Sequence, residues 1–281
     1  MDIPSYLRRL GRPDLLGAPA TLETLTALHA AHVERVPYEV LDIWLGRPTG
    51  IDPAESAARI VSGRGGYCYH LNGAFAALAT AMGFRVGRHV GGVHTADAPP
   101  AITGNHLVLT VELPEGRYLA DLGLGDALHE PLPLAEGRYR QGPFEYGMRP
   151  SVVAPGGWRL EHDPSGSFAG MDFALEETKM SAFTAMHEHL TTSPESGFVR
   201  TAVVQRRDRA GVDNLRGLVL TRLGHGAHRT TLETAADYFA ALADVFGLTL
   251  EDATEEEKAL LWKRVHAAHQ AWLNGTDPAV T

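Results

Sequence analysis

Cys68 is the only cysteine among the 281 residues of the chain, and one residue, Tyr67, separates it from the glycine-rich stretch GRGG at 63–66. The sequence predicts a helix that begins at Cys68, where unpaired backbone N–H groups and the helix dipole favour a thiolate. A thiolate attacks acyl carbonyls, but it needs a base and a group that orients the base. His106 and Asp121 follow in chain order and could supply both functions. We therefore predict a Cys–His–Asp triad whose carboxylate holds the imidazole in one tautomer.

The spacing of Asp121 is the weak point of this hypothesis. His106 begins the predicted strand NHLVLTVEL, and Asp121 lies near the end of RYLADLGLG, with a short hairpin loop, PEG, at 114–116 between them. A symmetric hairpin about this loop pairs Leu113 with Arg117, and it places Asp121 opposite Leu109 instead of His106. The triad therefore requires a bulge or a strand end that brings Asp121 back.

Other interpretations of these residues are weaker or simpler. A lone cysteine at a helix start is more often a packing residue, and an aspartate before glycine is usually a turn residue. GLGDAL at 123–128 resembles half of a dinucleotide-binding loop, but it lacks the third glycine. The 14 histidines allow a metal site. With no HExxH motif and no paired cysteines, we expect neither a metal nor a disulfide framework.

Net charge and hydropathy limit the partners and the cellular location that we expect for the protein. The chain carries 25 basic and 34 acidic residues, a formal net charge of −9. Nucleic acids and anionic membranes are therefore not expected as partners. No apolar run approaches the roughly 18 residues of a membrane span, and the segment MDIPSYLRRLGRPD has no apolar core of a secretory signal. A free cysteine fits a reducing compartment, so we predict a cytoplasmic protein.

The elements that must position the triad differ along the chain. Residues up to about 85 have helical periodicity, with Thr21 and Asp52 as predicted helix caps. The middle of the chain is rich in predicted strands separated by Gly, Pro and Asp, which indicates an antiparallel sheet or small barrel. After about residue 170 the pattern is mixed. The predicted segments are helices at 21–36, 52–62, 68–84, 231–248 and 254–273, a partly helical stretch at 172–190, and strands at 84–94, 105–113, 117–124, 156–163, 196–207 and 215–224.

Three segments resemble, in order and spacing, the active-site segments of the arylamine N-acetyltransferases. They are RGGYCYHLN, NHLVLTVEL and YLADLGLG. The family patterns are Arg-Gly-Gly-x-Cys-x-Glu-x-Asn, a His that opens a strand, and Asp-x-Gly-Phe-Gly. About 220 residues from Tyr6 can be followed in this way. The resemblance implies an α+β fold with an N-terminal helical bundle (1–85), a central antiparallel β-barrel (86–190) and a C-terminal α/β lid (191–281).

The resemblance also implies an activity. In such enzymes the cysteine takes an acyl group from a coenzyme A thioester and passes it to a small-molecule amine. Cys68 would be the acyl carrier, His106 the base and Asp121 the orienting acid. The Cys68 N–H is a candidate oxyanion donor. No permanently bound cofactor is expected, only acetyl-coenzyme A or another acyl thioester as co-substrate.

The chain departs from the family pattern around the triad. His70 stands where Glu is usual, Leu124 replaces a Phe, and Tyr38 and Val40 differ in the segment PYEVLD. We expect Tyr38, Tyr67, His70 and Leu124 to contact substrate.

These departures leave other functions open. One alternative is an amide synthase that closes a macrolactam from a polyketide thioester on an acyl carrier protein. A second is a hydrolase or thioesterase that uses the same triad. A third is a non-catalytic relative, with His70 marking the loss of function.

Overall fold

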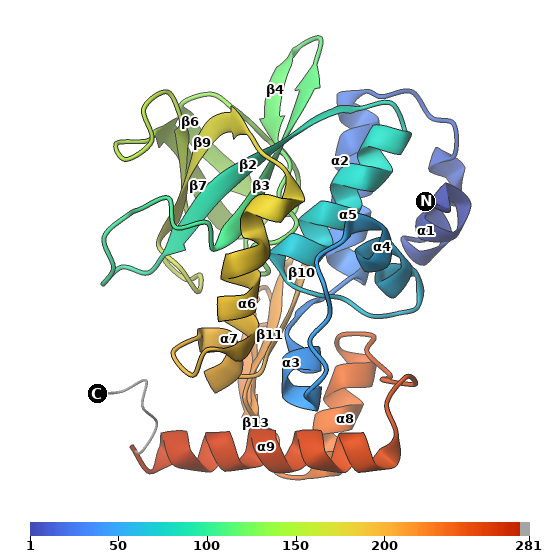
Figure 1. The fold of residues 1–281 in the computed structure, drawn as a ribbon, viewed down its shortest axis with the longest axis vertical. Helices are drawn as coiled ribbons and strands as arrows, with labels where there is room; N and C mark the ends of the chain where they lie inside the picture. The colour runs from blue at the N-terminus through green and yellow to red at the C-terminus, as the bar shows by residue number, and fades with distance from the viewer. Residues whose placement is uncertain (276–281) are drawn as a thin grey trace.

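The computed structural model describes residues 1–275 as helices around two antiparallel sheets (Figure 1). The helices are α1 (Ile3–Arg9), α2 (Leu22–Arg35), α3 (Leu41–Leu45), α4 (Pro53–Val61), α5 (Cys68–Ala81), α6 (Thr184–Thr192), α7 (Gly197–Arg200), α8 (Ala235–Asp244) and α9 (Glu255–Leu273), with 3₁₀ turns at Pro13–Leu15 and Met180–Phe183. The strands are β1 (Tyr38–Glu39), β2 (Arg85–His94), β3 (His106–Leu113), β4 (Gly116–Leu119), β5 (Leu132–Pro133), β6 (Gly137–Gln141), β7 (Phe144–Pro150), β8 (Trp158–Glu161), β9 (Gly170–Glu177), β10 (Val203–Asp208), β11 (Gly211–Arg216), β12 (Val219–Gly224) and β13 (His228–Thr231). None of the helices in this part of the chain is long and apolar enough to cross a membrane.

The N-terminal helices begin where their caps predict. The Thr21 hydroxyl accepts a hydrogen bond from the Thr24 N–H (3.3 Å), and the Asp52 carboxylate accepts bonds from two N–H groups in the first turn of α4. α5 begins at Cys68, as expected, and its side chains are buried on nearly every side. A helix that is enclosed in this way cannot rotate or shift without opening the core. The cysteine is therefore held at a fixed point between the helices and the sheets.

The larger sheet carries the other two residues of the predicted triad. Its eight strands run in the order β5-β4-β3-β2-β9-β8-β7-β6, and the sheet is nearly closed into a barrel. Its interior is filled by aliphatic and aromatic side chains, among them Val108, Tyr146 and Phe173. The predicted α+β class with a central antiparallel barrel is confirmed.

The β3–β4 hairpin differs from the predicted register by one residue. Leu113 pairs with Gly116, whereas the symmetric loop required Arg117. Gly116 has φ = 145°, a conformation that favours glycine, so the turn closes over two residues only. β4 then ends at Leu119, although the sequence predicted a strand up to residue 124. The triad required either a bulge or a strand end before Asp121. The structure has the strand end, because Asp121 lies beyond β4 and is no longer part of its hydrogen-bonded ladder.

The smaller sheet combines a short strand from the N-terminal part of the chain with four strands from its C-terminal part. Its order is β1-β10-β11-β12-β13, and the short strand β1 pairs Tyr38 with Gln205. Two predicted strands here were wrong in part: residues 197–200 form α7 before β10 begins, and the segment 215–224 is interrupted by a turn at Gly217, where φ is 57°. The division of the chain at residues 85 and 190 stays a prediction.

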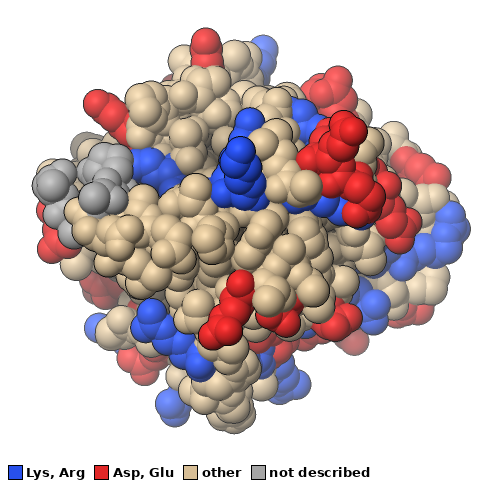
Figure 2. All heavy atoms as spheres, turned by 90° about the horizontal axis from the view of Figure 1, so that it is seen from below, with Lys and Arg blue, Asp and Glu red and all other residues tan. Residues whose placement is uncertain are grey.

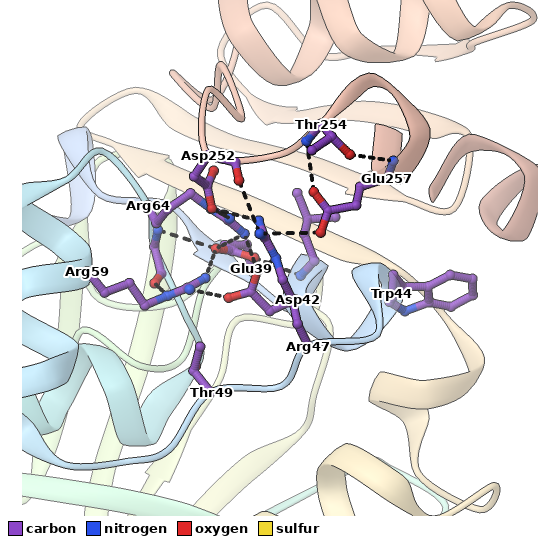
Figure 3. A network of polar contacts seen from close by, with 12 residues as sticks. Glu39, Asp42, Trp44, Arg47, Thr49, Arg59, Arg64, Asp252, Thr254 and Glu257 are labelled. Atoms are coloured by element: carbon purple, nitrogen blue, oxygen red, sulfur yellow. Dashed lines mark hydrogen bonds and ion pairs between the residues drawn. The ribbon is translucent and has the colours of Figure 1, made fainter. Parts of the chain in front are cut away.

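A buried network of ion pairs connects the N-terminal helices to the segment before α9 (Figure 3). Arg64 binds Asp42 (2.9 Å) and Asp252 (2.8 Å), and Arg59 binds Glu39 (2.6 Å) and also Asp42. Burial disfavours the charged form of Glu39, yet the charges of Arg64 and Arg59 lower its pKa to about 2. The network fixes the chain at 64–66, immediately before Cys68.

We expect the substitution Arg64→Met to lower the free energy of unfolding by about 3–5 kcal/mol, because it leaves buried carboxylates without a partner. The measurement is guanidinium denaturation at pH 7. Arg85→Met is the matched control, since Arg85 pairs with Glu112 on the surface with 79% of its side chain exposed. Its expected effect is below about 1 kcal/mol. Equal effects of the two substitutions would show that the network does not hold the fold together.

Candidate active site

The structure brings the three residues of the predicted triad together. His106 is the first residue of β3, and its Nε2 lies 2.7 Å from Oδ2 of Asp121, with both side chains buried. The Cys68 sulfur interacts with the same imidazole through its charge and a side-chain hydrogen bond, and it lies 3.7 Å from the carbonyl oxygen of Asn105. Since Nε2 faces Asp121, the second ring nitrogen is left for the sulfur.

The electrostatics of the site favour a charged imidazole. Burial alone would neutralise His106, but the negative charges and hydrogen bonds of Asp121 and Cys68 outweigh it and raise the pKa of His106 to about 10. At neutral pH the ring is therefore an imidazolium. A buried imidazolium beside a sulfur stabilises the thiolate, which is the nucleophilic form of cysteine.

Asn72 holds the carboxylate of Asp121 in place. Its Nδ2 donates to Oδ1 of Asp121 (2.8 Å), and its Oδ1 accepts from the backbone N–H of Leu122 (2.9 Å). The Gly123 N–H donates a further bond to Oδ1 of Asp121 (2.9 Å). Sequence reasoning assigned no role to Asn72. Its signal was the helical spacing, because Asn72 lies one turn after Cys68 on α5 and faces the same side.

Gly123 allows the loop after β4 to pack directly onto Cys68. A Cβ atom at this position would lie 2.6 Å from Cα of Cys68. Only glycine fits such a contact, and the contact keeps the Asp121 loop against the start of α5. The residue before the helix, Tyr67, makes no side-chain capping bond there. The backbone N–H groups in the first turn of α5 therefore do not donate to the Tyr67 side chain. These groups lie beside the Cys68 sulfur.

Aromatic side chains surround this end of α5. The Tyr67 ring lies 5.0 Å from that of Phe198, which also contacts Tyr38, and the Tyr67 hydroxyl bonds to His187. Burial and then the charge of Cys68 raise the pKa values of Tyr38, Tyr67 and Tyr69, which places all three near the sulfur. Tyr38 and Tyr67 were predicted, whereas Phe198 and His187 were missed because only the tertiary fold brings α6 and α7 to this point.

The His70 ring contacts two of these aromatic side chains, with its centroid 4.5 Å from that of Tyr67 and 6.2 Å from that of His187. Its Nε2 lies 3.2 Å from Oγ1 of Thr49, its Nδ1 has no partner among the described residues, and it borders a cavity of only about 10 Å³ together with Arg59. Burial first, and then the charge of Arg59, lower the pKa of His70 to about 3, so the ring is neutral. The structure thus places His70 beside both Tyr67 and Arg59 of the ion network.

Leu124 lies in the interior of the barrel. It is 6% exposed and belongs to the same hydrophobic cluster as Val108 and Tyr146. A buried leucine at this point lines the inside of the sheet next to the Asp121 loop.

At pH 7 we expect iodoacetamide to alkylate Cys68 about tenfold faster in the wild type than in His106→Gln, because the charged imidazole next to the sulfur stabilises the thiolate. Rates can be followed by intact-mass spectrometry, with circular dichroism to verify the fold of the variant. A variant that is alkylated as fast as the wild type would contradict the ion pair.

Known proteins provide an independent comparison. A family model described as N-acetyltransferase matches residues 21–255. The arylamine N-acetyltransferase of Mycolicibacterium smegmatis is 33% identical over 272 residues, which cover 90% of this chain and 94% of the relative. The arylamine N-acetyltransferase of Escherichia coli K12 is 29% identical over 255 residues, covering 87% of this chain and 90% of the relative.

Solved structures show the same fold. The arylamine N-acetyltransferase of Mycobacterium marinum in complex with CoA aligns with a TM-score of 0.84 at 28% identity, covering 95% of this chain and 99% of that one. The enzyme from Salmonella typhimurium aligns with a TM-score of 0.81 at 27% identity, covering 93% and 98%. The chain therefore belongs to the arylamine N-acetyltransferase family, as its three motifs predicted, and it is an acyl-transferring enzyme.

Proposed function

We propose that the chain transfers an acetyl group from acetyl-coenzyme A to an arylamine through a covalent intermediate on Cys68. The observation that carries this proposal is the buried arrangement of Cys68, His106 and Asp121 at the start of α5. The names of the relatives and the CoA complex of the M. marinum enzyme support the donor and the acceptor class. A nucleophilic thiol needs reducing conditions, so we place the activity in the cytoplasm.

The reaction takes place in two half-reactions. The Cys68 thiolate attacks the thioester carbonyl, and collapse of the tetrahedral intermediate breaks the bond to the coenzyme A sulfur. That sulfur leaves with the proton of the His106 imidazolium, and Cys68 now carries the acyl group as a thioester. The amine then attacks the acyl carbon and gives its proton to the neutral His106. The amide is released, and the thiolate–imidazolium pair is restored.

Each neighbour of the sulfur has a role in this scheme. Asp121 keeps the same tautomer of His106 in both half-reactions and stabilises its charge. The uncapped first turn of α5 includes the Cys68 N–H, which we propose as one donor to the oxyanion. The aromatic rings of Tyr38, Tyr67 and Phe198 favour a flat, apolar acceptor. We propose Phe198 as a further substrate contact, in addition to the predicted contacts Tyr38, Tyr67, His70 and Leu124.

Incubation with acetyl-coenzyme A is expected to add one acetyl group to the protein, seen by intact-mass spectrometry. The adduct should be absent in Cys68→Ala and should disappear when an arylamine such as aniline is added, with formation of acetanilide. The variant Asn72→Ala retains Cys68. Its Cys68 should be acylated about ten- to a hundredfold more slowly, because the Asp121 carboxylate loses the hydrogen bond from Asn72 that positions it.

Other outcomes would identify the alternatives. Thioester turnover that does not depend on added amine would indicate a hydrolase. Acylation by a carrier-bound thioester, without acylation by any coenzyme A thioester, would indicate an amide synthase. An unmodified Cys68 with every donor would contradict the proposal.

A further inference from the structure

Two histidines of α2 are buried against α5, the helix that carries Cys68. Figure 2 shows acidic and basic side chains spread over the surface on the side of α9, where water solvates their charges. His29 and His32, in contrast, are fully buried, and both rings lie edge-on to the Phe75 ring of α5, at centroid distances of 6.2 and 5.8 Å. Ring nitrogens are costly to bury unless they form hydrogen bonds. The hydrogen bonds of each ring therefore indicate its role.

The two rings form different hydrogen bonds. Nε2 of His32 lies 2.9 Å from the Tyr6 hydroxyl, so this bond stays within the N-terminal helices. Nδ1 of His29 lies 2.9 Å from the backbone oxygen of His129, which is 100 positions further along the chain. A backbone oxygen can only accept, so Nδ1 carries the ring proton and donates it. His29 thus connects α2 to the segment that follows β4, whereas His32 does not.

The segment between β4 and β5 depends on such bonds for its position. It covers residues 120–131, carries Asp121 and forms no strand of its own. At its far end, Nε2 of His129 lies 2.7 Å from the carboxylate of Glu34 on α2. His129 is therefore bound to α2 twice, through its backbone oxygen to His29 and through its ring to Glu34.

His29 is also close to Asp121 at the near end of this segment. Burial lowers the pKa of His29 to about 4, and the charge and the backbone oxygen of Asp121 oppose this effect only in part. The ring is therefore neutral at pH 7, and it does not compete with the charged His106 for the carboxylate. Nε2 of His29 has no hydrogen-bond partner among the described residues, so the bond to His129 is the one that orients the ring.

We propose that His29 is a positioning residue for the acyl transfer, which holds the segment 120–131 from α2 so that Asp121 meets His106 beside Cys68. Removal of the donor leaves the buried oxygen of His129 without this bond, and a small shift of the segment then moves the Asp121 carboxylate relative to the imidazole. The part of this inference that concerns catalysis rests on the proposed function, whereas the positioning of Asp121 does not.

Three variants separate positioning from packing. His29→Leu removes the donor and keeps an apolar side chain of similar size. His29→Asn keeps an N–H group close to the place of Nδ1. His32→Leu is the matched control, because His32 lies on the same helix, is equally buried and contacts the same Phe75 ring. Thermal unfolding verifies that the variants are folded. If His29→Leu does not fold, His29→Gln takes its place, since the longer side chain does not present an N–H at the place of Nδ1.

We expect the maximal single-turnover rate of Cys68 acetylation by acetyl-coenzyme A to fall about tenfold or more in His29→Leu. The half-saturating concentration of the thioester should change by less than about twofold, because His29 does not reach the donor. His29→Asn should recover most of the rate, and His32→Leu should stay within about threefold of the wild type. The imidazole ¹⁵N shifts of His106 should show a titration at lower pH in His29→Leu than in His32→Leu, because only the first variant weakens the contact with Asp121.

Equal effects of His29→Leu and His32→Leu on the acetylation rate and on the His106 titration would overturn the proposal. A loss of rate that His29→Asn does not restore would also overturn it. The titration of His106 needs no acyl donor, so the two proposals can fail separately. A shifted titration in His29→Leu, with no acetyl adduct in the wild type, would support the positioning role and contradict the proposed function. An acetyl adduct in the wild type, with no effect of His29→Leu, would do the reverse.

Discussion

Asp121 accepts hydrogen bonds from three groups at once: the His106 ring, the Asn72 amide and the Gly123 N–H. These bonds hold a carboxylate in a fully buried position, where an isolated charge would be very unfavourable. Against the effect of burial, the charges and hydrogen bonds of Asp121 and Cys68 raise the pKa of His106 to about 10, so the sulfur of Cys68 lies next to a positive imidazole. The acyl transfer that we propose depends on this one arrangement.

Contacts from the rest of the fold hold Asp121, His106 and Cys68 in this arrangement. β4 ends at Leu119, so the Asp121 loop is free to turn toward α5, and Gly123 lets it pack against Cys68. On the other side, the network around Arg64 fixes the approach to the helix and ties it to Asp252. The nucleophile is thus held by contacts from the N-terminal helices, the barrel and the segment before α9.

Local signals in the sequence predicted much of this arrangement. The caps Thr21 and Asp52, the helix start at Cys68 and the strand start at His106 all depend on near neighbours in the chain, and the structure has them where they were expected. The hairpin register was wrong by one residue, because the positive φ of Gly116 closes a shorter turn than a symmetric loop.

Other features could not be predicted because they depend on the tertiary fold. Phe198 reaches Tyr67 only through the position of α7, and His70 is neutral only because it is buried beside Arg59. Segments that resembled a known family therefore identified the chemistry, whereas the surroundings required the structure.

The most direct test of this account is the protonation state of His106, measured from the imidazole ¹⁵N chemical shifts over pH 6–11. The account predicts an imidazolium that loses its proton only near pH 10, and a loss at clearly lower pH in Asp121→Asn. A His106 ring that is already neutral at pH 7.5, or that titrates near its ordinary value of about 6.5, would contradict it.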